Sequence, residues 1–175
     1  TAAEDALTWV FDNKVRAGSK AQAAIVIMSA DGAVRGMVGG RKLRGVAGAF
    51  NRATMASRQP GSAFKPFVFA TALDMGWSYD SPILDEPITV NIPGSGEWSP
   101  QNYDRKFHGM VTVTEALKNS FNIPAVKLAM DVGLENVRTV AQMFGIESDL
   151  AQGPALALGA SESTLLEMTG AYAGI

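Results

Sequence analysis

The sequence contains no cysteine and a single histidine, His108. Without cysteine, neither a disulfide framework nor a thiolate metal site can form, and the redox compartment stays undetermined. With only one histidine, a histidine-rich metal cluster is excluded as well. We therefore predict a protein that uses neither a metal ion nor a cofactor.

Long apolar runs and basic tracts are also lacking. No apolar run approaches the length that spans a bilayer, and nothing resembles a signal peptide, so we expect any membrane anchor of the parent protein outside this chain. The net charge of −2 argues against a nucleic-acid partner. With 47% of its 175 residues apolar, the chain is predicted to form a single domain, 1–175, with a proper core.

The first stretch that carries chemistry is Arg58–Phe67. Its Pro-Gly pair predicts a turn, and the apolar spacing after it predicts a helix that ends at Gly76. Ser62 then lies at the helix N-terminus, where unpaired backbone N–H groups favour negative charge. Lys65 follows one turn later on the same side, and a lysine of lowered pKa is a base that can activate serine. Ser62 equally suits a simple helix N-cap.

A second candidate pair follows in a link between two helices. The capping-box pattern at Thr112 and Glu115 predicts the start of one helix, and Pro124 predicts the start of the next. Ser120 and Asn122, two residues apart in this link, are expected to point into one cleft. There a hydroxyl can carry a proton and an amide can hold a peptide. Alternatively, both residues only terminate the helix.

The pattern of the remaining elements, a hairpin followed by several helices, predicts an α/β (α+β) fold. A hairpin is predicted at residues 23–40, and its first strand, Ala23–Met28, is apolar on both faces, which is typical of a strand covered on each side. Two strands cannot make such a sheet alone, so the sheet is expected to be incomplete in this chain. Residues 60–175 are predicted to be mainly helical. Besides the helix after Ser62, helices are expected at about Ala3–Ala17, Pro124–Val132, Glu135–Phe144 and Leu165–Tyr172.

Taken together, these motifs resemble the penicillin-binding proteins, specifically the transpeptidase domain of the bifunctional (class A) members. The resemblance begins at about Ala21 and continues to the end of the chain. It rests on specific runs of residues: Phe50–Thr54, Arg58–Phe67, Trp98–Asn102, Gly109–Thr112, Glu115–Leu117, Ser120–Val126, Leu156–Ala160 and Leu166–Met168.

The resemblance implies a β-lactamase/transpeptidase-like fold, in which a helical cluster packs on an antiparallel sheet, and it implies roles for individual residues. Ser62 would be the acylated nucleophile, Lys65 its general base, Ser120 a proton relay, and Asn122 a hydrogen-bonding group for the substrate amide or for Lys65. Trp98 and Asn102 would border the substrate cleft. The implied reaction is a D,D-transpeptidation that cross-links peptidoglycan stem peptides through a serine acyl-enzyme, with β-lactams acylating the same serine, at the outer face of the plasma membrane or in the periplasm.

Two features depart from the family pattern. Phe121 occupies a place that is Asp in the related Ser-Asp-Asn motif, and that place varies in the class A group. None of the lysines is followed by Thr-Gly or Ser-Gly, so the third family motif is not in this chain. We therefore expect a piece of a longer protein, whose missing part or a second copy of the chain covers the sheet edge.

Two other functions remain open at this point. A serine β-lactamase or β-lactam sensor would keep the fold and change the fate of the acyl-enzyme. A catalytically silent interaction module of a cell-wall complex would use the fold without the chemistry.

Overall fold

The structure is a computed structural model that describes residues 1–42, 45 and 48–175. Within it, the contacts divide the chain into two compact units. Unit 1 comprises Thr1–Arg58, Phe144–Ser148 and Glu162–Ile175, and unit 2 comprises Gln59–Met143 and Asp149–Ser161. Each unit is therefore assembled from segments that lie far apart in the sequence.

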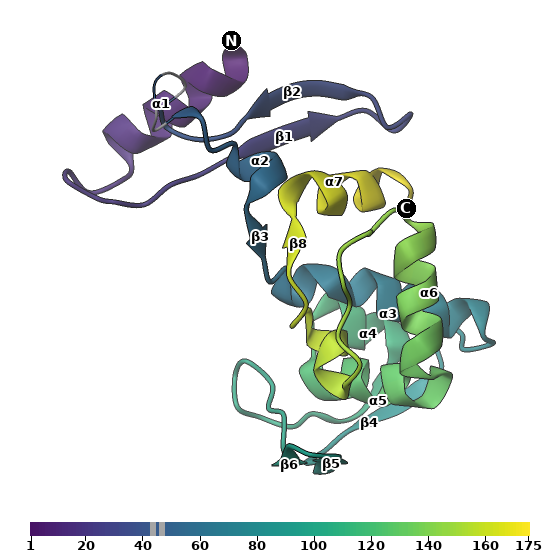
Figure 1. Cartoon of the computed structure of the whole chain (residues 1–175). Helices are drawn as coiled ribbons and strands as arrows, with labels where there is room; N and C mark the ends of the chain where they lie inside the picture. The colour runs from purple at the N-terminus through teal and green to yellow at the C-terminus, as the bar shows by residue number, and fades with distance from the viewer. Residues whose placement is uncertain (43–44, 46–47) are drawn as a thin grey trace. The chain divides into compact units, whose positions relative to one another are not determined.

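Unit 1 is built on an antiparallel hairpin of β1 (Ile25–Met28) and β2 (Val34–Val38), as predicted for residues 23–40. Helix α7 (Leu165–Ala173) packs against β1 (Figure 1). The same unit contains α1 (Ala2–Asn13), α2 (Arg52–Met55), and the short antiparallel pair of β3 (Ser57–Arg58) and β8 (Ser163–Thr164). The hairpin thus gains its cover from the distant C-terminal segment.

The sheet of unit 1 is incomplete, as expected. Its two strands form a sheet of their own, and Ile27 on β1 is 48% exposed. The described residues therefore leave part of this doubly apolar strand exposed, which agrees with the expected incomplete sheet. Helix α7 packs on β1, but one helix covers only one face of a strand whose side chains are apolar on both faces.

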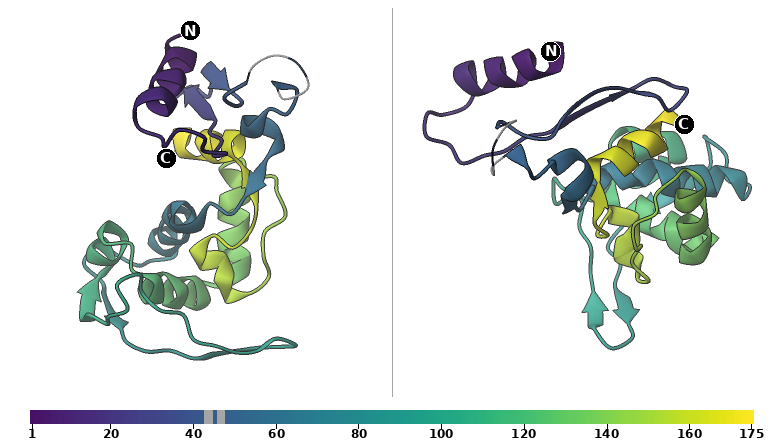
Figure 2. Two further views of the ribbon diagram at one scale, coloured as in Figure 1. Left: turned by 90° about the vertical axis from the view of Figure 1, so that its left-hand side faces the viewer. Right: turned by 45° about the horizontal axis from the view of Figure 1, so that its top comes forward.

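Unit 2 is a helical cluster with two short hairpins. Helix α3 (Lys65–Asp74) packs on α5 (Asn122–Val132) and α6 (Leu134–Met143), and α4 (Val113–Lys118) contacts both α3 and α5. Strands β4 (Pro82–Asp85) and β7 (Gly109–Thr112) pair antiparallel, as do β5 (Val90–Ile92) and β6 (Gly96–Trp98), which project from the helices (Figure 2). Short 3₁₀ turns η2 (Gly61–Phe64) and η3 (Pro154–Leu158) complete the unit.

The core of unit 2 follows from the helical periodicity of its apolar residues. Its fully buried large side chains come mainly from α3 and α5: Phe64, Phe67, Val68, Phe69, Ile123, Val126, Leu128, Val137 and Leu156. Burying each such side chain contributes roughly 1.5–3 kcal/mol. The helices and antiparallel strands of the two units confirm the predicted α+β class.

The helix predictions are confirmed with shifted ends. Helix α1 stops at Asn13, four residues before the expected end at Ala17, and α5 begins at Asn122, two residues before Pro124. The capping box predicted at Thr112 and Glu115 opens α4, and a further capping box, of Thr164 and Glu167, opens α7. Residues 162–175 pack with the hairpin of unit 1, so the predicted helical part 60–175 is shared between the two units. The single domain 1–175 stays a prediction.

Candidate active site

Ser62 lies in η2, directly before α3, and its side chain is exposed. Gly61 precedes it with φ 57°, a left-handed conformation that glycine adopts without strain. The backbone N–H of Gly61 donates to the carbonyl oxygen of Gly159 at 3.3 Å, and a Cβ on Gly159 would collide with the Gly61 backbone. The serine is thus held on a tight turn that is fixed by backbone-to-backbone contact.

Lys65, the first residue of α3, is buried, with 1% of its surface exposed. Its Nζ atom donates to the carbonyl oxygen of Ser120 at 2.5 Å, to Ser120 Oγ at 3.0 Å and to Asn122 Oδ1 at 2.6 Å. Burial lowers the pKa of Lys65 to about 8. A large fraction of this amine is therefore neutral at only slightly alkaline pH.

The link between α4 and α5 presents the partners of Lys65. Helix α4 ends at Lys118, and Ser120 follows in a left-handed conformation with φ 55°. For a residue other than glycine this backbone is strained, and such strain is concentrated at functional sites. This backbone conformation directs both the carbonyl and the hydroxyl of Ser120 toward Lys65 Nζ. Asn122, in the first turn of α5, contacts the same amine.

The three acceptors of Lys65 differ in what they can do. The Ser120 carbonyl and Asn122 Oδ1 only accept, whereas the Ser120 hydroxyl can donate or accept. A neutral amine has two N–H bonds and one lone pair. Lys65 in that state can donate to the two pure acceptors and accept a proton from a hydroxyl, so the arrangement suits proton exchange between Lys65 and a serine.

The structure therefore brings together Lys65, Ser120 and Asn122, and it places Ser62 three residues before Lys65. The backbone N–H of Lys65 donates to the Ser62 carbonyl within the same turn. An exposed hydroxyl one helical turn from a buried amine of lowered pKa is an arrangement that can support nucleophilic catalysis.

Trp98 and Asn102 occupy different settings. Trp98 lies on β6 opposite Val90 and is partly exposed. Asn102 is 4% exposed, and its amide bonds to protein groups on both sides: Nδ2 donates to Asp85 and to the Lys106 carbonyl, and Oδ1 accepts from the backbone N–H of Asn122. Asn102 is thus connected to Lys65 through Asn122, the first residue of α5.

Sequence reasoning did not single out Asp85, the last residue of β4. Its carboxylate is 0% exposed and accepts hydrogen bonds from Asn102 and from the backbone N–H and Nδ1 of His108. The hydrogen bond to Asp85 raises the pKa of His108. The available signal was an acidic residue at the end of an apolar strand segment, which by itself is indistinguishable from a solvated strand end.

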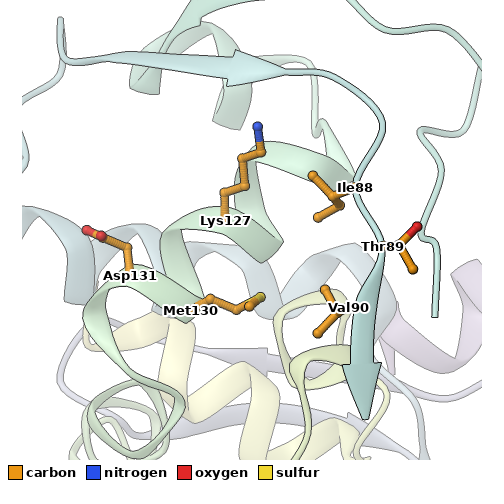
Figure 3. A pocket seen from close by; sticks show the side chains of 6 residues that line it. All are labelled: Ile88, Thr89, Val90, Lys127, Met130 and Asp131. Carbon is orange, nitrogen blue, oxygen red and sulfur yellow. The ribbon is translucent and has the colours of Figure 1, made fainter. Parts of the chain in front are cut away.

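A hollow of about 460 Å³ lies farther along α5 and is lined by Lys127, Met130, Asp131 and residues 88–90 (Figure 3). Lys127 donates there to the Leu84 carbonyl at 2.7 Å and to Glu86 at 3.1 Å. None of the four candidate catalytic residues lines this hollow.

Two kinds of feature are absent from the described residues. Among them, no group of three or more His, Asp or Glu side chains is arranged to hold a metal ion. In the same part of the chain, no helix combines the length and apolar character needed to cross a membrane.

Comparisons with known proteins agree on one similarity. A family model described as the penicillin binding protein transpeptidase domain matches residues 23–171. Over 157 residues, 86% of this chain, the sequence is 39% identical to penicillin-binding protein 1A of Neisseria lactamica, and over 144 residues, 81% of the chain, it is 39% identical to penicillin-binding protein 1B of Haemophilus influenzae. The chain spans 19% and 18% of these relatives' lengths.

Solved structures show the same similarity. Penicillin-binding protein 1A from Haemophilus influenzae aligns with a TM-score of 0.82 at 36% identity, over 87% of this chain and 23% of that one. PonA1 from Mycobacterium tuberculosis aligns with a TM-score of 0.81 at 26% identity, over 98% of this chain and 46% of that one. A further PonA1 structure, similar to the same degree, contains penicillin V.

Proposed function

The chain belongs to the penicillin-binding protein transpeptidase family, and we propose that it contributes the nucleophile, base and proton relay of a peptidoglycan D,D-transpeptidase. The observation that carries this proposal is the buried Lys65 amine, one turn from Ser62 and in contact with Ser120 and Asn122. A lysine held only for stability gains nothing from a pKa lowered to about 8, whereas a general base requires it.

In the first half of the reaction, Ser62 Oγ attacks the carbonyl carbon of the penultimate D-alanine of a stem peptide. Lys65 takes the hydroxyl proton as the C–O bond forms. The C–N bond to the terminal D-alanine then breaks, and its nitrogen receives a proton from Ser120 Oγ, which is replenished from Lys65 at 3.0 Å. The products are free D-alanine and an ester on Ser62.

In the second half, an amine of a neighbouring stem peptide attacks the ester. The proton of that amine returns through Ser120 and Lys65 to Ser62 Oγ as the ester bond breaks. The net change is one amide exchanged for another, so no oxidant, metal or cofactor is required.

The remaining roles follow from placement. Asn122 orients Lys65 through its Oδ1 atom. Trp98 stays our candidate for a residue that borders the substrate cleft. The partners are peptidoglycan stem peptides and β-lactams, and the location is the cell envelope on the outer side of the plasma membrane, where that polymer is made.

The test is the intact mass of the complete natural gene product that contains residues 1–175, measured after incubation with benzylpenicillin. We expect one stable adduct on the wild type, none on Ser62→Ala, and an unchanged adduct on the matched control Ser57→Ala. An adduct on Ser62→Ala would remove Ser62 from the mechanism.

The fate of the adduct distinguishes a transpeptidase from the two alternative functions. Rapid hydrolysis of nitrocefin would indicate a β-lactamase and contradict the proposal. Failure of both penicillin labelling and thioester acylation, in a protein that is folded by circular dichroism, would indicate an interaction module without chemistry.

A further inference from the structure

Helix α5 begins at the residue that orients Lys65, yet its own N-cap residue does not cap it. Phe121 occupies the N-cap position, and its side chain makes no capping hydrogen bond. The cap comes from a residue 20 positions earlier, because Asn102 Oδ1 accepts from the backbone N–H of Asn122 at 2.7 Å and of Ile123 at 3.4 Å. The start of α5 is therefore held by a buried side chain of another segment.

The Asp85 carboxylate fixes which way the Asn102 amide faces. Asn102 Nδ2 donates to both carboxylate oxygens, at 2.9 and 2.8 Å, and to the Lys106 carbonyl at 2.8 Å. An ionised carboxylate only accepts, so it requires the NH₂ side of Asn102. The amide oxygen must then face α5, where unpaired N–H groups need an acceptor.

Asp85 also supports Phe121, the residue before Asn122 in the link, through His108. The backbone N–H of His108 donates to Asp85 Oδ2 at 3.0 Å, and the His108 ring nitrogen Nδ1 lies 2.7 Å from the same atom. The ring stacks on Phe121 with centroids 4.1 Å apart and planes at 18°. Asp85 thus supports Asn122 through Asn102 and Phe121 through His108.

We propose that Asp85 and Asn102 form a positioning pair that holds the Ser120–Asn122 link against Lys65. Neither residue touches the reacting atoms, and both act through the placement of Ser120 Oγ and Asn122 Oδ1. This inference rests on the function proposed above. It also explains why a carboxylate is retained at 0% exposure, where burial of a charge is costly unless hydrogen bonds compensate for it.

Two single variants test the pair. Asp85→Asn places a donor opposite Asn102 Nδ2, and Asn102→Leu removes the acceptor that α5 uses. Because small misplacements of catalytic groups are costly, we expect each variant to lower the first-order rate constant of Ser62 acylation by nitrocefin by about 10²-fold. The dissociation constant of the initial nitrocefin complex is expected to change by less than about threefold.

A double variant tests the direction of the hydrogen bonds. Asp85→Asn combined with Asn102→Asp exchanges the amide and the carboxylate, so an NH₂ group again meets a carboxylate and α5 again finds an acceptor. Only the hydrogen bond to the Lys106 carbonyl is not restored, because a carboxylate cannot donate to it. We expect acylation at least tenfold faster than in Asp85→Asn alone. Asp104→Asn is the matched control, because Asp104 contacts His108 Nε2 at 3.1 Å and makes no bond to Asn102.

A pH profile separates positioning from simple loss of stability. If the link is looser, water reaches Lys65, whose contacts are the uncharged Ser120 and Asn122, and the pKa of Lys65 rises toward its ordinary value. The pH below which acylation slows should therefore be higher in both single variants than in the wild type. A role in stability alone would lower the fraction of molecules that become acylated. It would leave the pH–rate profile and the rate constant of the folded molecules unchanged. That result, or no recovery in the double variant, would overturn the proposal.

The outcomes also separate this inference from the proposed function. If Ser62→Ala is still labelled, the proposed function fails. If Ser62→Ala is unlabelled while the positioning variants acylate like the wild type, only the positioning pair fails. Should Asp85→Asn not fold, Asn102→Leu carries the same expectation, since it leaves Asp85 bonded to His108. All measurements use the complete gene product.

Discussion

The Nζ atom of Lys65 lies 2.6 Å from Oδ1 of Asn122, although 57 positions separate the two residues in the sequence. Lys65 is the first residue of α3 and Asn122 the first of α5, so this contact joins the N-terminal ends of two helices. Both ends carry partial positive charge, which stabilises negative charge nearby. An oxyanion formed at Ser62 would develop close to this region.

The first prediction concerns the lysine itself. Lys65→Arg retains a positive charge, but a guanidinium cannot give up its proton in a protein. We expect the rate of Ser62 acylation by benzylpenicillin to fall by roughly 10²–10⁴-fold, the usual contribution of a general base. Lys127→Arg, a lysine bonded to Leu84 and Glu86 in unit 2, should leave the rate within twofold. An active Lys65→Arg enzyme would exclude Lys65 as the base.

The second prediction concerns stability and pH. The pKa of Lys65 is about 8 in the folded chain and 10.5 when unperturbed, so between these values the unfolded chain binds more protons. The free energy of unfolding should therefore rise with pH across this window, by an amount on the order of 3 kcal/mol at most. Urea denaturation of the wild type and Lys65→Met at pH 7.5, 9 and 10.5 measures it. Parallel curves for both proteins would contradict the shift.

The third prediction separates strain from chemistry at Ser120. Ser120→Gly and Ser120→Ala both remove the hydroxyl, but only glycine is unstrained at φ 55°. We expect Ser120→Gly to be more stable than Ser120→Ala by roughly 1 kcal/mol in urea denaturation. Both should lose acylation rate to a similar degree, because both lack the hydroxyl that we propose as the proton relay. If alanine proves the more stable, the left-handed backbone at this position is wrong.

The fourth prediction concerns the glycine opposite the nucleophile turn. Gly159→Ala adds a Cβ that collides with the Gly61 backbone and also strains a residue with φ 67°. We expect a loss of roughly 2–4 kcal/mol in the free energy of unfolding and a slower acylation of Ser62.

Gly76→Ala is the matched control for this change, because φ there is 102° and the space around it is open. Backbone strain alone should cost it about 1–2 kcal/mol, without an effect on acylation of the folded fraction. Equal effects of the two substitutions on acylation would show that the Gly159 contact does not position Ser62.

Local patterns were sufficient for much of the fold and for the local structure of the segments that carry Ser62 and Ser120. The turn before Ser62, the apolar spacing of α3 and the capping box of α4 are encoded within a few residues, and the structure has them where the sequence predicts them. The link at Ser120 was predicted for the same reason, since Pro124 ends one pattern and begins another.

The supports of the site could not be predicted in this way. Asp85, Asn102 and His108 meet through contacts across 17 and 23 positions, and no local pattern specifies such pairings. By contrast, the incomplete sheet around β1 was predicted, because a strand that is apolar on both faces needs more cover than a two-stranded hairpin provides.

The division into two units has a consequence for the order of folding during synthesis. Unit 2 is fully translated once Ser161 has been made, whereas unit 1 still awaits Glu162–Ile175, which contain the helix that packs on β1. Because chains emerge from the ribosome N-terminus first, the β1–β2 hairpin is made early and lacks its contact with α7 while more than a hundred later residues are translated. The segment that holds Ser62, Lys65 and Asn122 can therefore finish folding before the hairpin that precedes it in the sequence.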